Sequence, residues 1–264
     1  MKILQILNEG ITEYQTKMNQ AQDHIENMDV FSIMFNQRQD MIISEGIAYI
    51  DIKGVLLSDA TQLDLQTGNT GYDEIKRDIE HALISNVEGI VFHINSPGGD
   101  SVGSHEIASM VQNLPVPSIA YIKNLGASAA YKIASAASLI MSSPSARVGG
   151  IGSLLVYQDI SQMLQNLHVN YITFVNEGAI YKSIGHGNRD LTEEQMEYIQ
   201  QAVTKSGNEF KEFVKENREV DDKVFTAAVF SGDEAEEVGL VDLIGDFDTT
   251  QYIAKRFFEI FPSM

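Results

Sequence analysis

The sequence has no cysteine and no tryptophan, and its basic residues are scarce. Without cysteine the chain can form no disulfide, no thiolate zinc site and no cysteine nucleophile, so serine, lysine, histidine and the carboxylates are its reactive side chains. Only 18 Lys and Arg residues stand against 37 Asp and Glu residues, which gives a net charge of −19 at pH 7. Such a charge repels phosphate backbones and anionic lipids, so we expect no nucleic-acid partner.

Long apolar runs are absent as well. No window approaches the roughly 20 apolar residues that cross a bilayer. The apolar start at residues 1–7 is interrupted by Gln5 and gives way to Asn8, a pattern that does not fit the apolar core of a secretory signal. We therefore expect a chain that has no membrane anchor and resides in the cytoplasm.

The length and the apolar content leave room for one large domain or two small ones, since 44% of the 264 residues are hydrophobic. Residues 1–40 are polar with a loose helical periodicity, which predicts a helical N-terminal arm outside the core. Residues 41–250 carry the predicted core of the main domain. Residues 251–264 are predicted to form a helical tail.

Predicted strands and helices alternate along the main domain. The strands are predicted at 46–52, 89–94, 118–122, 139–141 and 171–175, and the helices at 72–85, 104–114, 129–137 and 160–167. Segment 58–71 lacks periodicity and predicts a surface loop. Alternation at this spacing implies right-handed βαβ crossovers, and therefore an α/β fold with a mostly parallel sheet.

A long C-terminal helix is predicted after these units. Thr192 and Gln195 form a capping-box pattern that marks its start. Its apolar face is made by Met196, Ile199, Val203, Phe210 and Phe213. A face of this kind must pack against another part of the protein.

A glycine-rich segment, Asn95–Asp100 (Asn-Ser-Pro-Gly-Gly-Asp), lies between a predicted strand and a predicted helix. In a parallel sheet this is the carboxyl end of a strand, where ligands bind. Its paired glycines let the backbone approach a substrate closely and supply one N–H donor of an oxyanion hole. A tight turn without a catalytic role is the commoner explanation of such residues taken alone.

Ser128 lies in a second segment of small residues, Leu125–Tyr131, again between a strand and a helix. At a helix N-terminus the free N–H groups and the helix dipole stabilise negative charge on an attacked carbonyl oxygen. Ser128 is therefore a candidate nucleophile. The commoner role of a serine at this place is to cap the helix, and this alternative stays open.

A serine nucleophile needs a base. The histidines are His24, His81, His93, His105, His168 and His186, and none lies in the stretch just beyond the Ser128 helix. His93 is inside a predicted strand, where a core role is expected. A lysine can act instead, because burial lowers the pKa of an ammonium group and favours the neutral amine. Lys182 follows the predicted strand at 171–175 and has apolar neighbours, although a solvated lysine is the commoner case.

Together these segments resemble peptidase family S49, the signal peptide peptidase A group and its tailed-phage relatives, which have the Clp/crotonase fold. The similarity runs from about Gly46 to Gly245 and marks 41–250 as the peptidase domain. It rests on Asn95–Gly99, Ala127–Tyr131, Tyr181–Lys182, the closing Gly239–Asp242 (Gly-Leu-Val-Asp), and the 54-residue gap between the serine and the lysine.

The resemblance implies a serine peptidase with a Ser-Lys dyad. It makes Ser128 the nucleophile and Lys182 the general base. The backbone N–H groups of Gly99 and Ala129 become the oxyanion hole. No metal and no cofactor is expected.

Within the family, three segments look most like those of phage head-maturation proteases: Thr70–Asp73, Ser128–Tyr131 and Gln158–Ser161. The expected lack of a membrane anchor points the same way. The resemblance thus implies an endopeptidase that cleaves scaffold, portal or coat proteins during capsid maturation. It also implies a homo-oligomer that acts in the host cytoplasm or inside the procapsid.

One position departs from the family pattern. Where relatives usually read Gly-Ser-Ile-Gly, this chain has Gly-Gly-Ile-Gly at Gly149–Gly152, so the serine that orients the lysine amine is missing at Gly150. We expect Ser153, Ser183 or a water molecule to replace it, or activity to stay low until assembly orders the site.

Other classes of protein stay open. An anchorless bacterial protease similar to signal peptide peptidase would carry the same motifs. A crotonase-type acyl-CoA enzyme needs the same oxyanion loops but no nucleophile, and an inert assembly subunit needs neither. The combination of Ser128 with Lys182 argues against these last two classes.

Overall fold

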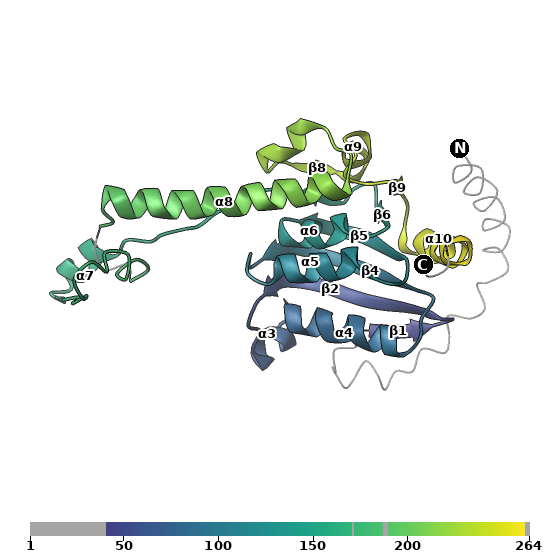
Figure 1. Ribbon diagram of the computed structural model, residues 1–264, viewed down its shortest axis with the longest axis horizontal. Coiled ribbons are helices and arrows are strands. Elements are labelled where there is room, and N and C mark those ends of the chain that lie inside the picture. Colours follow the sequence, from purple (N-terminus) through teal and green to yellow (C-terminus); the bar gives the residue numbers. More distant parts are fainter. Residues whose placement is uncertain (1–40, 171, 187–189, 262–264) are drawn as a thin grey trace. The chain divides into compact units, whose positions relative to one another are not determined.

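The computed structural model describes residues 41–170, 172–186 and 190–261, and the chain divides into two compact units (Figure 1). The first unit comprises the described residues up to Ile151 and from Phe213 onward, and the second comprises those within Gly152–Glu212. Helix α8 (Glu193–Asn217) begins in the second unit, and its last residues belong to the first. The helical arm predicted at residues 1–40 lies outside the described residues.

The first unit is built on a mostly parallel sheet, which confirms the predicted α/β class. Its central strands, in spatial order, are β1 (Met41–Ser44), β2 (Ile47–Leu57), β4 (Gly89–Gly99), β5 (Ser118–Ala127), β6 (Leu139–Ser142) and β9 (Leu243–Ile244). Strand β1 pairs antiparallel with β2, and the other neighbours in this order are parallel. The parallel order follows from the crossovers that the alternating pattern predicts.

Three short strands extend the sheet beyond this path. They are β3 (Thr70–Gly71), which pairs with β2, β7 (Arg147–Gly149), which pairs with β5, and β8 (Val229–Ser231), which pairs antiparallel with β7. The pairing of β7 with β5 matters for the site, because it brings the glycine pair at 149–150 next to the end of β5.

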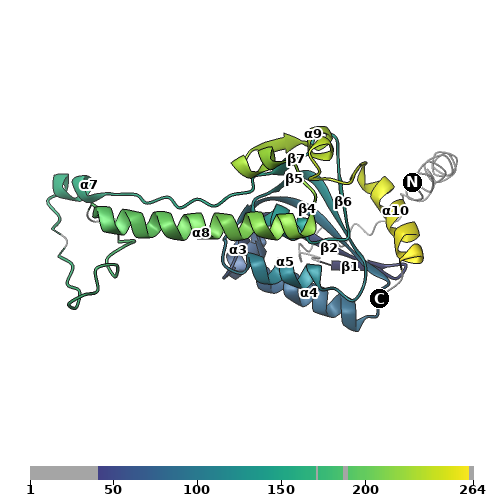
Figure 2. The same ribbon diagram turned by 45° about the horizontal axis from the view of Figure 1, so that its top comes forward.

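Helices cover both faces of the sheet (Figure 2). Helices α4 (Tyr72–Ile84), α5 (Ser104–Gln112) and α6 (Ala129–Ser135) lie on one face, and α10 (Phe247–Ile260) lies on the other. Because both faces are buried, the strands read as continuous apolar runs, as in Ile90–Phe92 of β4, where every side chain is buried. The segment predicted as a tail at 251–264 is thus largely part of α10, which packs into the core.

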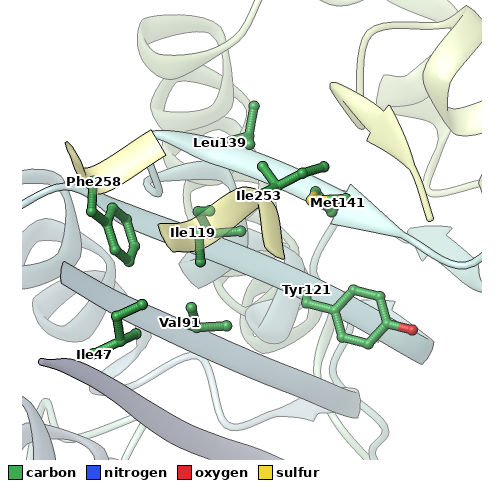
Figure 3. Close-up of a cluster of buried hydrophobic side chains, with 9 residues drawn as sticks. Ile47, Val91, Ile119, Tyr121, Leu139, Met141, Ile253 and Phe258 are labelled. Atoms are coloured by element: carbon green, nitrogen blue, oxygen red, sulfur yellow. The ribbon is translucent and has the colours of Figure 1, made fainter. Parts of the chain in front are cut away.

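The cluster beneath α10 shows how this second face is filled (Figure 3). Val91, Ile119 and Met141 of three neighbouring strands meet Ile253 and Phe258 of the helix. Gly89 leaves the space for the Phe258 ring, since a Cβ there would lie 2.4 Å from ring atoms. Burial of such side chains, each worth roughly 1.5–3 kcal/mol, holds α10 on the sheet.

Two predicted loops differ from the structure. Segment 58–71 contains helix α3 (Gln62–Gln66), which begins at a capping box between Thr61 and Asp64, and it ends in β3. The segment after the predicted strand at 89–94 is not a free loop either, because β4 continues to Gly99 by pairing with Leu56 of β2. Short elements of this kind depend on tertiary partners that local periodicity does not reveal.

The elements that complete the first unit are the 3-10 helix η2 (Asp222–Thr226) and helix α9 (Gly232–Glu237). The second unit contains α7 (Ser161–Asn166) and most of α8. The strand predicted at 171–175 is wrong for its described residues: 172–175 are irregular, and Ile172 and Phe174 are 74% and 89% exposed. Apolar residues form a strand only where a neighbouring strand satisfies the backbone, and no strand among the described residues pairs with this segment.

Candidate active site

Three of the sequence motifs meet at the carboxyl ends of neighbouring parallel strands. Ser96 of β4 is in register with Gly126 of β5, and Ala127 of β5 is in register with Gly149 of β7. The glycine-rich segment, the serine segment and the glycine pair at 149–150 therefore come together at one edge of the sheet. This is the place at which α/β proteins bind their ligands.

Ser128 occupies the sharp turn from β5 into α6. Its backbone angles are φ 55° and ψ −128°, a combination that residues other than glycine rarely adopt. Its side chain makes no capping hydrogen bond to α6, so helix capping does not account for this serine. Strained strand-to-helix turns of this kind present the nucleophilic serine of α/β-hydrolases.

Gly98 lies directly against this turn. Its φ is +89°, and a Cβ at Gly98 would come within 2.8 Å of both the nitrogen of Ala129 and the Cβ of Ser128. Ala129 is the first residue of α6, so its N–H has no acceptor inside the helix. The close approach that requires glycine thus brings the Asn95–Gly99 backbone next to a helix N–H at the serine.

Hydrogen bonds hold the glycine-rich segment on both sides. Ser96 Oγ donates to the carbonyl of Gly54 at 2.6 Å and accepts from the N–H of Gly98 at 3.0 Å. The Asp100 carboxylate accepts two 2.9 Å bonds, from the N–H and the hydroxyl of Ser58.

The hydroxyl of Tyr72 donates to the Asp100 carbonyl. Burial raises the pKa of Tyr72 above its usual value, and the negative charge of Asp100 raises it further. Tyr72 therefore stays a donor.

The helix that follows Ser128 is fixed at its centre by Tyr131. The Tyr131 side chain is fully buried, and its hydroxyl donates to the carbonyl of Leu240 at 2.9 Å. Burial raises the pKa of Tyr131, so the hydroxyl keeps its proton. The closing Gly-Leu-Val-Asp motif is thereby tied to the serine motif.

Arg218 fixes the other end of α6, and the sequence analysis did not identify it. Its guanidinium donates to the carbonyls of Ser135 and Ala137, the former from Nε at 3.0 Å, and to Asp242 Oδ2 at 3.0 Å. Asp242 also accepts a 2.7 Å bond from the N–H of Ile140. No sequence motif contains Arg218; its position just beyond the end of a long helix was the only signal.

Gly150, the position that departs from the family pattern, lies beside the serine. Its φ is +65°, and its N–H donates to the carbonyl of Ala228 at 2.8 Å. A Cβ at Gly150 would lie 3.3 Å from the backbone nitrogen of Ser128. A side chain at this position would therefore start next to Ser128.

Lys182 belongs to the second unit, whereas Ser128 belongs to the first. It lies in a series of turns, its side chain is exposed, and its N–H donates to the carbonyl of Ala179 at 3.1 Å. The expectation that it follows a buried strand is wrong, since 172–175 are irregular.

The two serines expected to replace the missing family serine also lie in the second unit, and both have side-chain partners there. Ser183 Oγ accepts from Gln195 Nε2 at 3.2 Å, and the hydroxyls of Ser153 and Ser206 are 3.0 Å apart. Each hydroxyl is thus already held by another side chain.

His93 is packed in the core between Tyr121 and Phe247, as expected, and its Nδ1 is 2.8 Å from Asp51 Oδ1. Its Nε2 is buried without a hydrogen-bond partner.

Within the described ranges, no three His, Asp or Glu side chains are grouped as a metal site. In the same ranges, every helix is too short or too polar to cross a bilayer.

Comparison with known proteins places these motifs in a family context. The sequence profile of peptidase family S49 matches residues 112–257. Head-tail preconnector protein GP5 of Enterobacteria phage P21 is 31% identical over 80% of this chain and 43% of its own length. Capsid assembly protease C of Escherichia phage lambda is 28% identical over 78% of this chain and 48% of its own.

A cellular relative lies at a similar distance. The putative signal peptide peptidase SppA of Enterococcus faecium is 30% identical over 60% of this chain and 48% of its own length. The chain therefore spans about half the length of these curated relatives. Among solved structures, ClpP1 from Listeria monocytogenes is similar with a TM-score of 0.49 and 14% identity, over 76% of this chain and 93% of the other. Since the family profile covers more than half of the sequence, the chain belongs to peptidase family S49.

Proposed function

We propose that the chain is a serine endopeptidase in which Ser128 attacks the scissile carbonyl carbon and Lys182 is the general base. The observation that carries this proposal is the backbone of Ser128, strained at φ 55° with a hydroxyl that does not cap the helix, at the N-terminus of α6. Strain of this kind persists where a particular side-chain direction is required. We assign the oxyanion hole to the backbone N–H groups of Gly99 and Ala129.

The proposed reaction moves one proton in a cycle. The neutral amine of Lys182 takes the proton of the Ser128 hydroxyl as Oγ attacks, and the ammonium then gives it to the leaving amine. A water molecule hydrolyses the resulting ester, with the same lysine as base. The oxyanion donors act only when the carbonyl oxygen carries charge, so they stabilise the transition state more than the substrate.

For the biological role, we favour capsid maturation, with scaffold, portal or coat proteins as substrates. The support is that the two phage relatives are 28–31% identical to this chain over 78–80% of its length. A homo-oligomer in the host cytoplasm or procapsid belongs to the same proposal. The second candidate is a bacterial protease similar to signal peptide peptidase, which the 30% identity to the Enterococcus faecium protein favours.

The test compares the wild type with Ser128→Ala and Lys182→Ala on two substrate sets. One set holds phage scaffold, portal and coat proteins, and the other holds secretory signal peptides. Mass spectrometry of new N-termini should show site-specific cuts in the first set that neither variant makes. Cuts confined to signal peptides would favour the second candidate, and cuts made by Ser128→Ala at the wild-type rate would refute the nucleophile.

A further inference from the structure

The turn that carries Lys182 is joined to the start of helix α8 by the side chain of Gln195. Gln195 Nε2 donates to the carbonyl of Ile180 and, at 3.2 Å, to Ser183 Oγ. These two acceptors lie on either side of Lys182 in the sequence. Gln195 is only 2% exposed, and buried hydrogen bonds of this kind are stronger than those in contact with water.

The capping box of α8 fixes which way the Gln195 amide points. Its Oε1 accepts from the N–H of Thr192 at 3.2 Å, and its own N–H donates to Thr192 Oγ1 at 3.2 Å. With the oxygen held at the helix start, the two amide hydrogens are directed at the turn. One side chain therefore caps the helix and holds the turn at once.

A second set of contacts joins the same two elements on their exposed side. The hydroxyl of Tyr181 donates to Glu194 Oε1 at 3.1 Å, and the Tyr181 ring stacks on Tyr198 with centroids 4.4 Å apart. Within the turn, the N–H of Ile184 donates to the carbonyl of Tyr181. Because these rings and carboxylates are exposed, their contribution is smaller than that of the buried amide.

We propose that Gln195 is a positioning residue for the proposed base: it holds the turn that carries Lys182 against the start of α8 through the Ile180 carbonyl and the Ser183 hydroxyl. This inference rests on the proposed function, since it assigns Lys182 the role of base. Misplacement of a reacting group by about 1 Å costs up to about 100-fold in rate, so the loss of this contact should be visible in kcat.

Gln195→Glu separates the two tasks of this side chain. Glutamate serves as well as glutamine in a capping box, so the helix start is kept. The variant has no N–H to give to Ile180 or Ser183. We expect kcat to fall by about 10- to 100-fold with KM unchanged, and the melting temperature to fall as well, because the buried carboxylate oxygen faces two acceptors. Gln200→Glu adds the same charge at an exposed position of α8 and should keep the wild-type kcat.

Hydrogen exchange gives a readout that does not depend on cleavage. The N–H groups of Lys182 and Ile184, bonded to Ala179 and Tyr181, should exchange faster in Gln195→Glu and stay at the wild-type rate in Gln200→Glu. Ser183→Ala, which removes one acceptor only, is the milder variant and should lower kcat by a smaller factor with a smaller loss of stability.

The failure of this inference differs from the failure of the proposed function. Wild-type kcat and unchanged exchange in Gln195→Glu, with Ser128→Ala and Lys182→Ala inactive, would overturn the positioning role alone. Full activity of Lys182→Ala would overturn the base assignment, and the positioning role with it.

Discussion

The main-chain N–H of Ser128 donates a 2.9 Å hydrogen bond to the carbonyl oxygen of Gly149. This bond joins the turn after β5 to the end of β7 and thereby sets Gly150 beside the proposed nucleophile. The N–H of Gly150 in turn donates to the carbonyl of Ala228. These two hydrogen bonds, one on each side of the Gly149–Gly150 peptide, hold Gly150 at its left-handed φ of +65°.

Gly150→Ser should not raise activity. A side chain at a left-handed position costs about 1–2 kcal/mol, which offsets the roughly 1 kcal/mol that a new hydrogen bond to the lysine amine would supply. Gly150→Ala is the matched control, because it has the same strain without the hydroxyl. Both variants should melt at a temperature lower by a few degrees, with turnover at or below that of the wild type. A faster Gly150→Ser with an unchanged melting temperature would contradict this prediction.

Arg218→Met should destabilise the fold by about 2–4 kcal/mol, since it leaves the Ser135 and Ala137 carbonyls and the Asp242 carboxylate without their shared donor. Urea unfolding with a constant m-value measures the change. Arg218→Lys keeps the charge but cannot reach three acceptors, so its loss should be intermediate. A loss below about 0.5 kcal/mol in Arg218→Met would show that this network is not needed for stability.

Asp51→Asn should lower the free energy of unfolding at neutral pH but not at strongly acid pH. Burial by itself would raise the Asp51 pKa, but hydrogen bonds from His93 and Lys53 outweigh it and hold the pKa below its usual value. The charged form is thus favoured in the folded state. The ionised carboxylate contributes to the free energy of unfolding above pH ~3.9, the pKa of an aspartate in the unfolded chain. This contribution is lost as the pH falls through the lower pKa that Asp51 has in the folded state.

The expected difference between wild type and Asp51→Asn is about 1 kcal/mol at pH 7, reduced by the partial exposure of the carboxylate. Urea titrations at a series of pH values should show the two proteins converging below about pH 4. A gap that stays constant down to strongly acid pH would mean that the substitution acts through packing rather than charge.

The sequence predicted the parts that depend on local pattern. The helices at 72–85, 104–114 and 129–137 and the core strands form as expected, because apolar periodicity and buried runs reflect the two-sided sheet. The capping box at Thr192 and Gln195 is confirmed by its two hydrogen bonds. The places of the glycine segment and Ser128 between a strand and a helix follow from the same alternation, and their catalytic roles stay predictions.

The parts that the sequence missed depend on long-range partners. Arg218 reaches Asp242 and the end of α6 across the fold, and nothing in its neighbours marks that role. The strand predicted at 171–175 is absent from its described residues. An apolar run indicates that a segment favours burial, but it does not identify the strand or helix that would bury it. The second hydrogen-bonding task of Gln195 was hidden because the capping pattern already explained the residue.

Substrate specificity should favour small or apolar residues just before the cut. The small residues that flank Ser128 leave space for a short side chain, and the carboxylate of the adjoining glycine-rich segment, Asp100, is already engaged by Ser58. Cleavage of a peptide library with mass-spectrometric detection measures the preference. A dominant preference for Lys or Arg before the cut would overturn this prediction.

The central claim, that Ser128 is activated by Lys182, is tested most directly by reaction with a serine-directed fluorophosphonate probe followed by peptide mapping. The wild type should carry one adduct, on Ser128. Lys182→Arg should be as unreactive as Lys182→Ala, because a guanidinium stays protonated at every accessible pH and cannot accept the serine proton. Labelling of Ser128 in Lys182→Arg at the wild-type rate, or labelling of another serine in the wild type, would contradict the account.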